Sequence, residues 1–254
     1  MRSLNILGIK VSCVNFQQAM LQIEKFIHSQ KPHQVITLNP EFVITAQKDK
    51  EFKEIINKGD LVVPDGIGIV WASRLMGTPL KERVTGVELV WSLSKLASQK
   101  GYSIFFLGGG KGVAKQTAIN LQKRYPELKV AGTESGSPYD PTLIPKISSK
   151  KPTILFVAFG HPKQEKWIFK YKNRLGIPVM IGVGGAFDFI SQRVKRAPVW
   201  IQKIGLEWFY RLVKQPSRWK RQLSLIQFAF LIIKESTIIF VSRAIKKFFK
   251  KPRR

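Results

Sequence analysis

One acidic residue, Asp65, stands in the sequence as a candidate catalytic base. It follows the apolar run Leu61-Val-Val-Pro64 and precedes Gly66 and Gly68. This pattern predicts a buried strand, a carboxylate at its carboxyl end and a tight turn into a helix. Ligands of open α/β sheets bind outside the carboxyl ends of the strands. At its ordinary pKa of about 4, such a carboxylate is ionised at neutral pH and can accept a proton from a nearby hydroxyl group.

Other apolar runs also end on polar residues or glycines, as expected of a sheet that gathers its strand ends around one crevice. They are residues 35–39, 104–110, 154–160 and 179–185. Glycines 108–110 and Gly112 lie between a predicted strand and a helix, where free N–H groups suit a phosphate. Their spacing matches neither a dinucleotide fingerprint nor a P-loop, so a tight turn without a ligand is the equal alternative.

Two further strand ends carry functional groups. In His161-Pro-Lys-Gln-Glu165, Lys163 and Gln164 are predicted to point into the crevice, whereas a lone histidine at such a position is more often structural. Residues 182–188 are rich in glycine, which permits close backbone approach to a ligand, and end in Asp188, which could accept hydrogen bonds from a base or sugar. Caps or salt bridges are the alternative roles for Glu165 and Asp188.

The order of these runs predicts the fold class. Strands alternate with predicted helices, among them 40–59, 66–77 and 86–100, which indicates an α/β fold: a Rossmann-like, mostly parallel sheet with helices on both faces. We expect this core to span residues 1–194. A basic helical C-terminal appendage is predicted for residues 195–254, which contain no strand pattern.

Composition limits the chemistry. The chain has 254 residues, three histidines and a single cysteine, Cys13, so we expect no intrachain disulfide and no zinc-type cluster. We also expect no secretory signal, because the N-terminus lacks a long apolar region. No Asp-x-Asp-type motif suggests a metal site, and no cofactor is predicted.

Charge is concentrated in the tail. Residues 189–254 hold 17 Lys or Arg against two acids, a net of +15 out of +27 for the chain. Such a field attracts polyanions, either nucleic acid or an anionic membrane surface. The apolar stretch 223–241 is interrupted by Lys234-Glu235 and is predicted to be too short to cross a bilayer. We favour a helix lying in the membrane interface; the alternatives are a buried helix packed on this domain or on a second copy, as in a homo-oligomer, and then a spanning helix.

Many short motifs, in order from about residue 5 to 221, resemble those of the WecG/TagA/CpsF glycosyltransferases. They are Thr37-Leu-Asn39, Pro64-Asp-Gly66, Arg83-Val-Thr-Gly86, Phe106-Leu-Gly-Gly109, Gly160-His-Pro-Lys-Gln-Glu165, Gly182-Val-Gly-Gly-Ala-Phe-Asp188, Arg196-Ala-Pro198, Gly205-Leu-Glu-Trp-Phe-Tyr-Arg211 and Pro216-Ser-Arg218. The combination is specific, although no single motif would suffice.

The resemblance implies a metal-independent, inverting transfer of N-acetylmannosamine from a UDP donor to undecaprenyl-diphosphate-linked N-acetylglucosamine. It also implies a peripheral position at the cytoplasmic face of the membrane, in teichoic acid or related polysaccharide synthesis. N-acetylmannosaminuronic acid and glucose-type sugars are the second and third donor choices.

The resemblance also assigns roles to individual residues. It makes Asp65 the general base, with Thr37, Asn39, Gln164 and Arg83 beside it in the pocket. It places Gly108, Gly109 and Asp188 at the nucleotide. The remaining assignments are arginines of the appendage that neutralise the diphosphate: Arg211, Arg218 and Arg221. The sequence departs from the family after Gly136, where Ser137-Pro138 replaces a common Gly-Tyr-Phe.

Two other function classes compete. A nucleic-acid-binding protein would explain the charge and the basic-aromatic tail, but no helix-turn-helix, zinc-finger or aromatic RNA-binding signature is present, so we expect no nucleic acid partner. A non-catalytic polysaccharide scaffold of the same fold would not require Asp65, Thr37 and Asn39 together.

Overall fold

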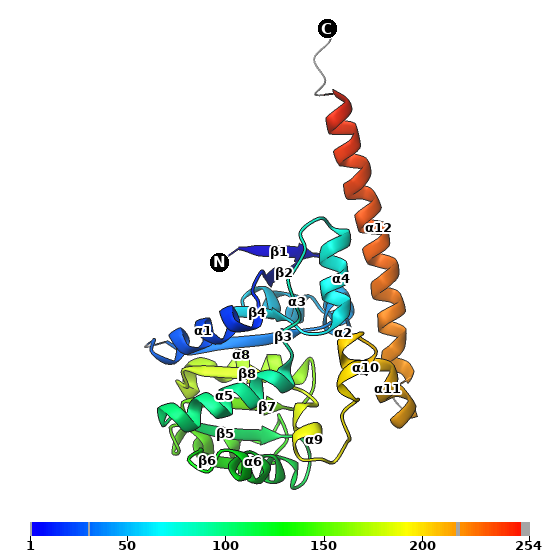
Figure 1. Cartoon of the computed structure of the whole chain (residues 1–254). Coiled ribbons are helices and arrows are strands. Elements are labelled where there is room, and N and C mark those ends of the chain that lie inside the picture. Colours follow the sequence, from blue (N-terminus) through cyan, green and yellow to red (C-terminus); the bar gives the residue numbers. More distant parts are fainter. Residues whose placement is uncertain (1, 30, 217–218, 250–254) are drawn as a thin grey trace.

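The structure is a computed structural model that describes residues 2–29, 31–216 and 219–249. A parallel sheet of six strands, in the order β4-β3-β8-β7-β5-β6, forms its centre (Figure 1). The strands are β3 (His33–Leu38), β4 (Leu61–Pro64), β5 (Ser103–Gly108), β6 (Lys129–Glu134), β7 (Ile154–Ala158) and β8 (Val179–Gly182). The α/β prediction is confirmed.

Helices cover both faces of this sheet. Neighbouring residues of a strand point to opposite faces, so Val35 joins one hydrophobic cluster and Ile36 another. The helices against the first face are α1 (Phe16–Ile27), α5 (Gly86–Lys100) and α6 (Val113–Arg124). Those on the second face are α2 (Pro40–Lys48), α3 (Lys50–Asn57), α7 (Leu143–Ser148) and α8 (Lys163–Leu175). Burial on both faces explains why strands such as β4 and β7 are continuously apolar.

The single helix predicted for residues 40–59 is wrong, because the structure contains two. Asp49 has an extended backbone (φ −122°, ψ 97°), and its side chain accepts a hydrogen bond from the N–H of Phe52. It therefore ends α2 and caps α3. The two N-terminal strands β1 (Ser3–Ile6) and β2 (Ile9–Ser12), which form an antiparallel hairpin, were also not anticipated.

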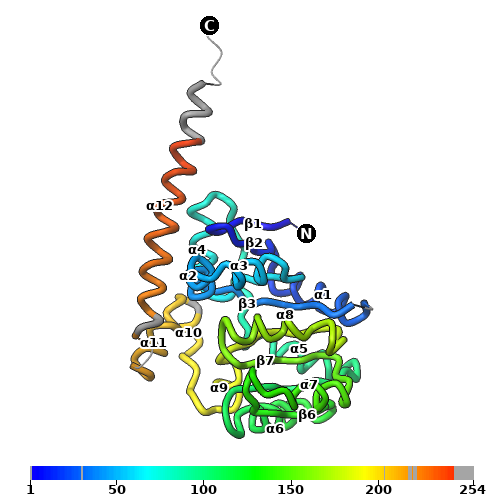
Figure 2. Tube along the Cα trace, turned by 180° about the vertical axis from the view of Figure 1, so that it is seen from behind, coloured from blue at the N-terminus to red at the C-terminus, as the bar shows by residue number. Residues whose placement is uncertain are grey.

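The C-terminal segment is helical, as expected. It comprises α9 (Ala186–Ile190), α10 (Val199–Lys203), α11 (Glu207–Lys214) and the long α12 (Trp219–Phe249). The first part of α12 lies beside α2 and α4 (Ile67–Leu75), whereas its later part extends beyond the body (Figures 1 and 2). Phe228 and Ile232 are buried in the same cluster as Phe42 and Ile69. The start of α12 is thus part of the core, and a domain boundary near residue 194 stays a prediction.

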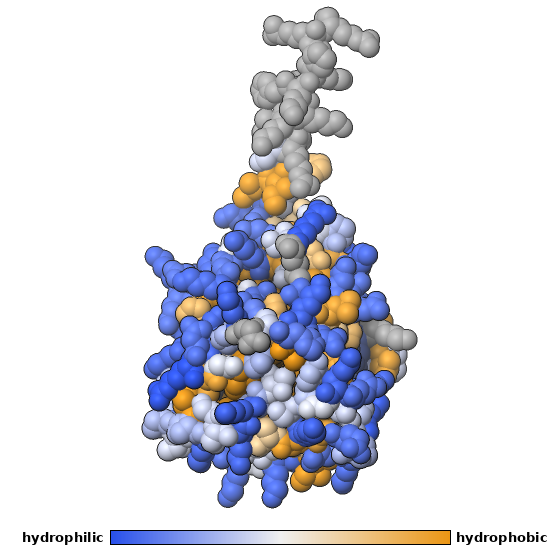
Figure 3. All heavy atoms as spheres, turned by 90° about the vertical axis from the view of Figure 1, so that its left-hand side faces the viewer, coloured by the Kyte–Doolittle hydropathy of each residue, from blue (hydrophilic) through white to orange (hydrophobic). Residues whose placement is uncertain are grey.

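The other face of α12 is apolar and exposed. Its large exposed side chains include Ile226, Phe230, Ile238, Phe240 and Val241, and apolar atoms gather where α12 extends beyond the largely hydrophilic body (Figure 3). The stretch Gln222–Ser242 is long and apolar enough, by length and composition, to cross a membrane. The expectation that it falls short is wrong on that measure, because the helix continues through Lys234-Glu235 and its mean hydropathy stays high despite these two charges.

Candidate active site

A cavity of about 740 Å³ opens at the carboxyl ends of β3, β4, β7 and β8. It is lined at one end by Thr37, Asn39, Asp65 and Gln164, and α11 and α12 close its other sides. Its volume lies within the range of roughly 300–1,000 Å³ that is typical of small-ligand sites. The structure therefore brings together the four residues expected to form the catalytic group.

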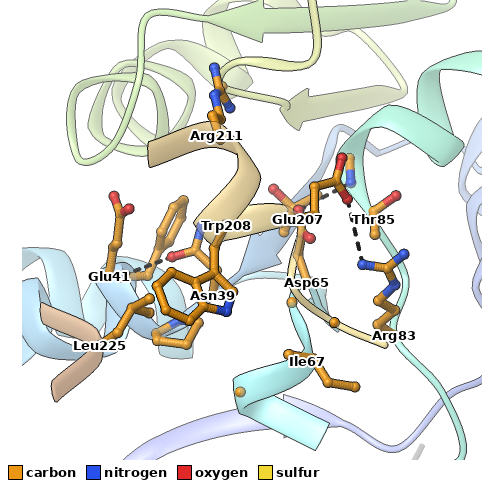
Figure 4. A pocket seen from close by; sticks show the side chains of 18 of the residues that line it. Asn39, Glu41, Asp65, Ile67, Arg83, Thr85, Glu207, Trp208, Arg211 and Leu225 are labelled. Atoms are coloured by element: carbon orange, nitrogen blue, oxygen red, sulfur yellow. Dashed lines mark hydrogen bonds and ion pairs between the residues drawn. The ribbon is translucent and has the colours of Figure 1, made fainter. Parts of the chain in front are cut away.

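Asp65 directly follows β4 and faces this cavity (Figure 4). Its Oδ2 accepts a hydrogen bond of 3.1 Å from the N–H of Gly86, the first residue of α5. Part of its surface remains open to the cavity, yet dense surrounding protein withdraws the carboxyl group from bulk water. This burial raises the pKa of Asp65 to about 7, against the lowering effect of the Gly86 hydrogen bond. The ordinary pKa assumed from sequence is therefore corrected upward, to a value better suited to a general base near neutral pH.

Thr37 and Asn39 are held by the ends of their own elements. The Thr37 hydroxyl donates to the carbonyl of Gly182 at 2.9 Å, joining β3 to β8 across the sheet. The side-chain oxygen of Asn39 accepts from the N–H of Phe42 at 3.2 Å and caps α2, with Pro40 at the first helical position. Both roles are structural, and both hold the side chains at the cavity wall.

Gln164 ties two strand ends together. Its Oε1 accepts from the N–H groups of Gly160, after β7, and Gly184, after β8, each at 3.1 Å. Its Nε2 donates to Oε1 of Glu165 at 2.7 Å. A Cβ added at Gly182 would collide with this pair, so the glycine there makes room for the Gln164–Glu165 contact.

Arginines from two distant segments converge on Glu207 of α11. Arg196 Nε donates to Glu207 Oε1 at 2.8 Å, and Arg83 Nη1 lies 3.6 Å from Glu207 Oε2 (Figure 4). The charge of Glu207 adds to the raised pKa of Asp65, and that of Arg83 opposes it. Arg83 therefore lines the pocket as expected, and α11 is fastened to the core through these ion pairs.

Arg211 also lines the cavity, from the next turn of α11. Its Nη2 lies 3.4 Å from Oδ2 of Asp188, and its guanidinium stacks over Phe189, 4.7 Å from the ring centroid. A Cβ on Gly185 would come within 2.7 Å of Arg211 Nη2, so this glycine admits the arginine. Asp188 itself does not line the cavity. Its carboxylate contacts Arg211, which does.

Gly108 and Gly109 lie at the end of β5, outside the cavity lining. Their φ values of +99° and +79° favour glycine, and a Cβ on Gly108 would stand 2.8 Å from the backbone of Ala158. Backbone geometry thus explains both glycines, and a nucleotide role for them stays a prediction. Arg218 lies outside the described residues, as does the side chain of Arg221, whose backbone belongs to α12. Among the described residues, no cluster of three or more His, Cys, Asp or Glu could hold a metal ion.

Comparison with known sequences identifies the family. The family model described as "Glycosyl transferase WecG/TagA/CpsF family" matches residues 4–239. The chain belongs to the WecG/TagA/CpsF family. It is therefore a glycosyltransferase, the first of the three function classes weighed from the sequence.

Three relatives illustrate the similarity to this family. An N-acetylglucosaminyldiphosphoundecaprenol N-acetyl-beta-D-mannosaminyltransferase of Bacillus subtilis (strain 168) is 40% identical over 215 residues, 84% of each chain. Proteins of the same name from Bacillus spizizenii and Staphylococcus aureus (strain MW2) are 37% and 33% identical. They cover 79% and 91% of this chain, and 78% and 92% of their own lengths.

Sequence reasoning gave no role in the glycosyltransferase site to Glu207 or Trp208, which both line the cavity. The sequence feature that could have pointed to them is the glycine just before them, Gly205. In the structure its φ is +80°, and a Cβ there would lie 2.8 Å from Ile67. A glycine of this kind brings α11 against α4, so the residues that follow it face the site. His161 stacks on Phe42 at 4.8 Å between ring centroids, which agrees with a structural role.

Glu165 is the second unusual acid of this site. It is fully buried, and its Oε2 has no hydrogen-bond partner within the described part of the chain. Burial raises its pKa to about 8, so the group is mainly neutral at pH 7. A neutral carboxyl group costs far less to bury than an ionised one. Oε1 of Glu165 accepts the hydrogen bond that fixes the orientation of the Gln164 amide.

This burial predicts a pH-dependent stability. A raised folded-state pKa contributes stability that is present below about pH 4.5 and is lost as pH rises through about 8. We therefore expect Glu165→Gln, which keeps an acceptor for Gln164, to unfold at a temperature similar to that of the parent protein at pH 5 and clearly higher at pH 8.5. Thermal unfolding followed by circular dichroism would measure both.

Glu165→Ala is the matched comparison. It removes the acceptor of the Gln164 amide and should lose about 1–3 kcal/mol at pH 5. A difference between Glu165→Gln and the parent that does not widen with pH would show that Glu165 is already ionised in the folded protein.

Proposed function

We propose that this glycosyltransferase moves N-acetylmannosamine from UDP to a polyprenyl-diphosphate-linked N-acetylglucosamine, with inversion, in teichoic acid or related surface-polysaccharide synthesis. The names of the relatives, which cover 79–91% of this chain, support this acceptor and sugar. N-acetylmannosaminuronic acid and glucose-type sugars remain the second and third donors.

The observation that carries the proposed mechanism is Asp65, whose carboxylate a strand end places in the cavity with a pKa of about 7. The other two acids of the lining contact basic side chains: Glu207 pairs with Arg83 and Arg196, and Glu41 lies 3.9 Å from His161. An inverting transfer needs one base that takes the proton of the acceptor hydroxyl group while that oxygen attacks the anomeric carbon from the face opposite the departing UDP. A base of this pKa is substantially ionised at neutral pH and still retains driving force for proton transfer. We assign this role to Asp65.

The leaving diphosphate needs positive charge. Arg83, Arg196 and Arg211 line the cavity, and arginine suits bidentate contact with phosphate oxygens. Arg83 and Arg196 share Glu207, and Arg211 contacts Asp188 at 3.4 Å, so a diphosphate would compete with carboxylates for these guanidinium groups. We propose that Arg218 and Arg221 add to this set.

We propose further that α12 holds the enzyme at the anionic, cytoplasmic face of the membrane as a peripheral protein. Exposed apolar side chains such as Phe230 and Phe240 would enter the interface, and the basic residues that follow them would contact lipid headgroups. The burial of Phe228 and Ile232 in the core favours an interfacial helix over a spanning one, since a spanning helix would have to give up this packing.

A donor panel tests the reaction. Purified full-length protein would be incubated with UDP-N-acetylmannosamine, its uronic acid and UDP-glucose, each with a short-chain lipid-diphosphate N-acetylglucosamine, in excess EDTA. We expect a single added N-acetylhexosamine by mass spectrometry with the first donor. Transfer that stops in EDTA and returns with Mg²⁺ or Mn²⁺ would contradict the arginine-based account of the leaving group.

The variant Asp65→Asn tests the base. It keeps the size of the side chain and removes its proton affinity, so kcat should fall by about 10²–10⁴-fold while UDP binding is retained. The unfolding temperature should not fall, because the buried carboxylate with its raised pKa is replaced by a neutral amide. In the parent protein kcat/KM should rise with pH to a plateau above about 7, because only ionised Asp65 accepts the proton. Wild-type turnover in Asp65→Asn would remove it from this role.

The variant Phe240→Asp tests the membrane-facing surface. Phe240 is 73% exposed, so the change should leave the unfolding temperature within about 2 °C, because surface substitutions rarely alter stability much. It should lower co-sedimentation with anionic liposomes several-fold at moderate salt, where electrostatic attraction alone is weakened. Unchanged sedimentation would place the membrane contact elsewhere.

A further inference from the structure

The cavity has a second compartment, which we call the apolar limb. Away from Asp65 its walls are formed by α4 on one side and α12 on the other. The side chains that define it are Trp71, Leu75, Leu225, Phe228, Ala229 and Ile232. It joins the polar end without a break, because Ile67 and Trp208 line the same cavity between the two (Figure 4).

Packing holds the two walls at a fixed separation. Phe228 and Ile232 are 4% and 2% exposed, and they anchor α12 in the core between α2 and α4. On α4, a Cβ added at Gly68 would meet Pro40 at 2.8 Å, so the absence of a side chain there lets α4 approach α2. The limb is therefore built into the fold.

The rim of the limb is unusually apolar for a surface. Trp71 and Leu75 lie one helical turn apart on the same face of α4, and they are 57% and 59% exposed. Across the gap, Ile233 is 59% exposed and also lines the cavity. Large apolar groups that converge on an open space indicate a binding surface.

A ligand that fills both compartments must be amphiphilic. The polar end offers a carboxylate and arginines to a sugar and a diphosphate, whereas the six side chains that define the limb are hydrocarbon apart from the indole N–H of Trp71. Gln222, one turn before Leu225 on α12, is the nearest polar residue of that wall of the cavity. We propose that the apolar limb binds the first isoprene units of the lipid chain of the acceptor, which positions the sugar hydroxyl group at Asp65. This inference rests on the proposed function, and it names the structural element that selects a polyprenyl acceptor.

The dimensions restrict the contact to the start of the chain. A total of about 740 Å³ has to hold a sugar and a diphosphate as well, so most of an undecaprenyl chain stays outside. The exposed apolar face of α12, from Phe230 to Phe240, continues from the limb and offers that remainder a path towards the bilayer. A UDP-sugar, which has no hydrocarbon, would leave the limb empty.

The test compares two acceptors in one variant. Ala229 is a small residue on the limb wall of α12, and Ala229→Phe would narrow the limb. With N-acetylglucosamine linked through diphosphate to either a methyl or a farnesyl group, in neutral detergent, the parent protein should prefer the farnesyl acceptor. In Ala229→Phe the ratio of kcat/KM for farnesyl over methyl should fall at least about tenfold, in line with the discrimination that pocket shape provides.

The control is Ile226→Phe, which makes a similar change on the outer face of α12, where Ile226 is 68% exposed and outside the cavity lining. It should leave the ratio unchanged. A ratio that is unaffected in Ala229→Phe, or equally lowered in Ile226→Phe, would overturn the proposal. If the parent protein glycosylates neither acceptor, the proposed function itself is wrong.

Photo-crosslinking tests the limb independently of turnover. A farnesyl diphosphate that carries a diazirine on its first isoprene unit should label peptides from 67–75 and 225–233, and unlabelled farnesyl diphosphate should compete. A lack of label on 67–75, label on 225–233 confined to the outward-facing Ile226 and Phe230, or competition by phospholipid instead of farnesyl diphosphate would show that the limb does not select an isoprenoid.

Discussion

The site depends on one constraint: a carboxyl group is held at the end of a buried strand with little access to water. Asp65 directly follows β4, and its carboxylate accepts a hydrogen bond from the N–H of Gly86 at the start of α5. Burial raises its pKa to about 7. Burial and the helix start act in opposite directions, since the N–H group favours the ionised form. Their balance places the pKa where a base is both available and effective.

The elements around Asp65 are arranged so that this balance persists. Gln164 joins the ends of β7 and β8 with one amide oxygen, and its orientation is fixed by the buried Glu165. Glu207 attaches α11 to the core through Arg83, and Arg196, which contacts both Glu207 and Glu88 of α5, adds a second link. The arginines that would face a diphosphate are thus positioned by the same ion pairs that attach the C-terminal segment.

The C-terminal segment is part of the folded core as well as the segment proposed to meet the membrane. Through Phe228 and Ile232, the first half of α12 completes the core between α2 and α4 and supplies one wall of the cavity. Its later half presents apolar side chains outward, and basic residues follow. One helix therefore links the candidate active site to the surface proposed to meet the membrane. This arrangement suits the proposed acceptor, which has a soluble head and an insoluble chain.

The sequence by itself determined the sheet, the strand ends and the family, because burial on both faces leaves continuous apolar runs, and motifs in a conserved order are specific. Asp65, Thr37, Asn39 and Gln164 could be placed together for that reason. The pKa of Asp65 and the contact of Glu207 with Arg83 were decided by tertiary structure, since they arise between segments distant in sequence. The break at Asp49 is local, because it depends on a cap to Phe52 three residues later, and the continuous apolar pattern of residues 40–59 hid it. The packing of α12 was also decided by tertiary structure. Its apolar residues are equally compatible with burial in a protein core and with contact to a membrane, and only the positions of α2 and α4 show which of them are buried.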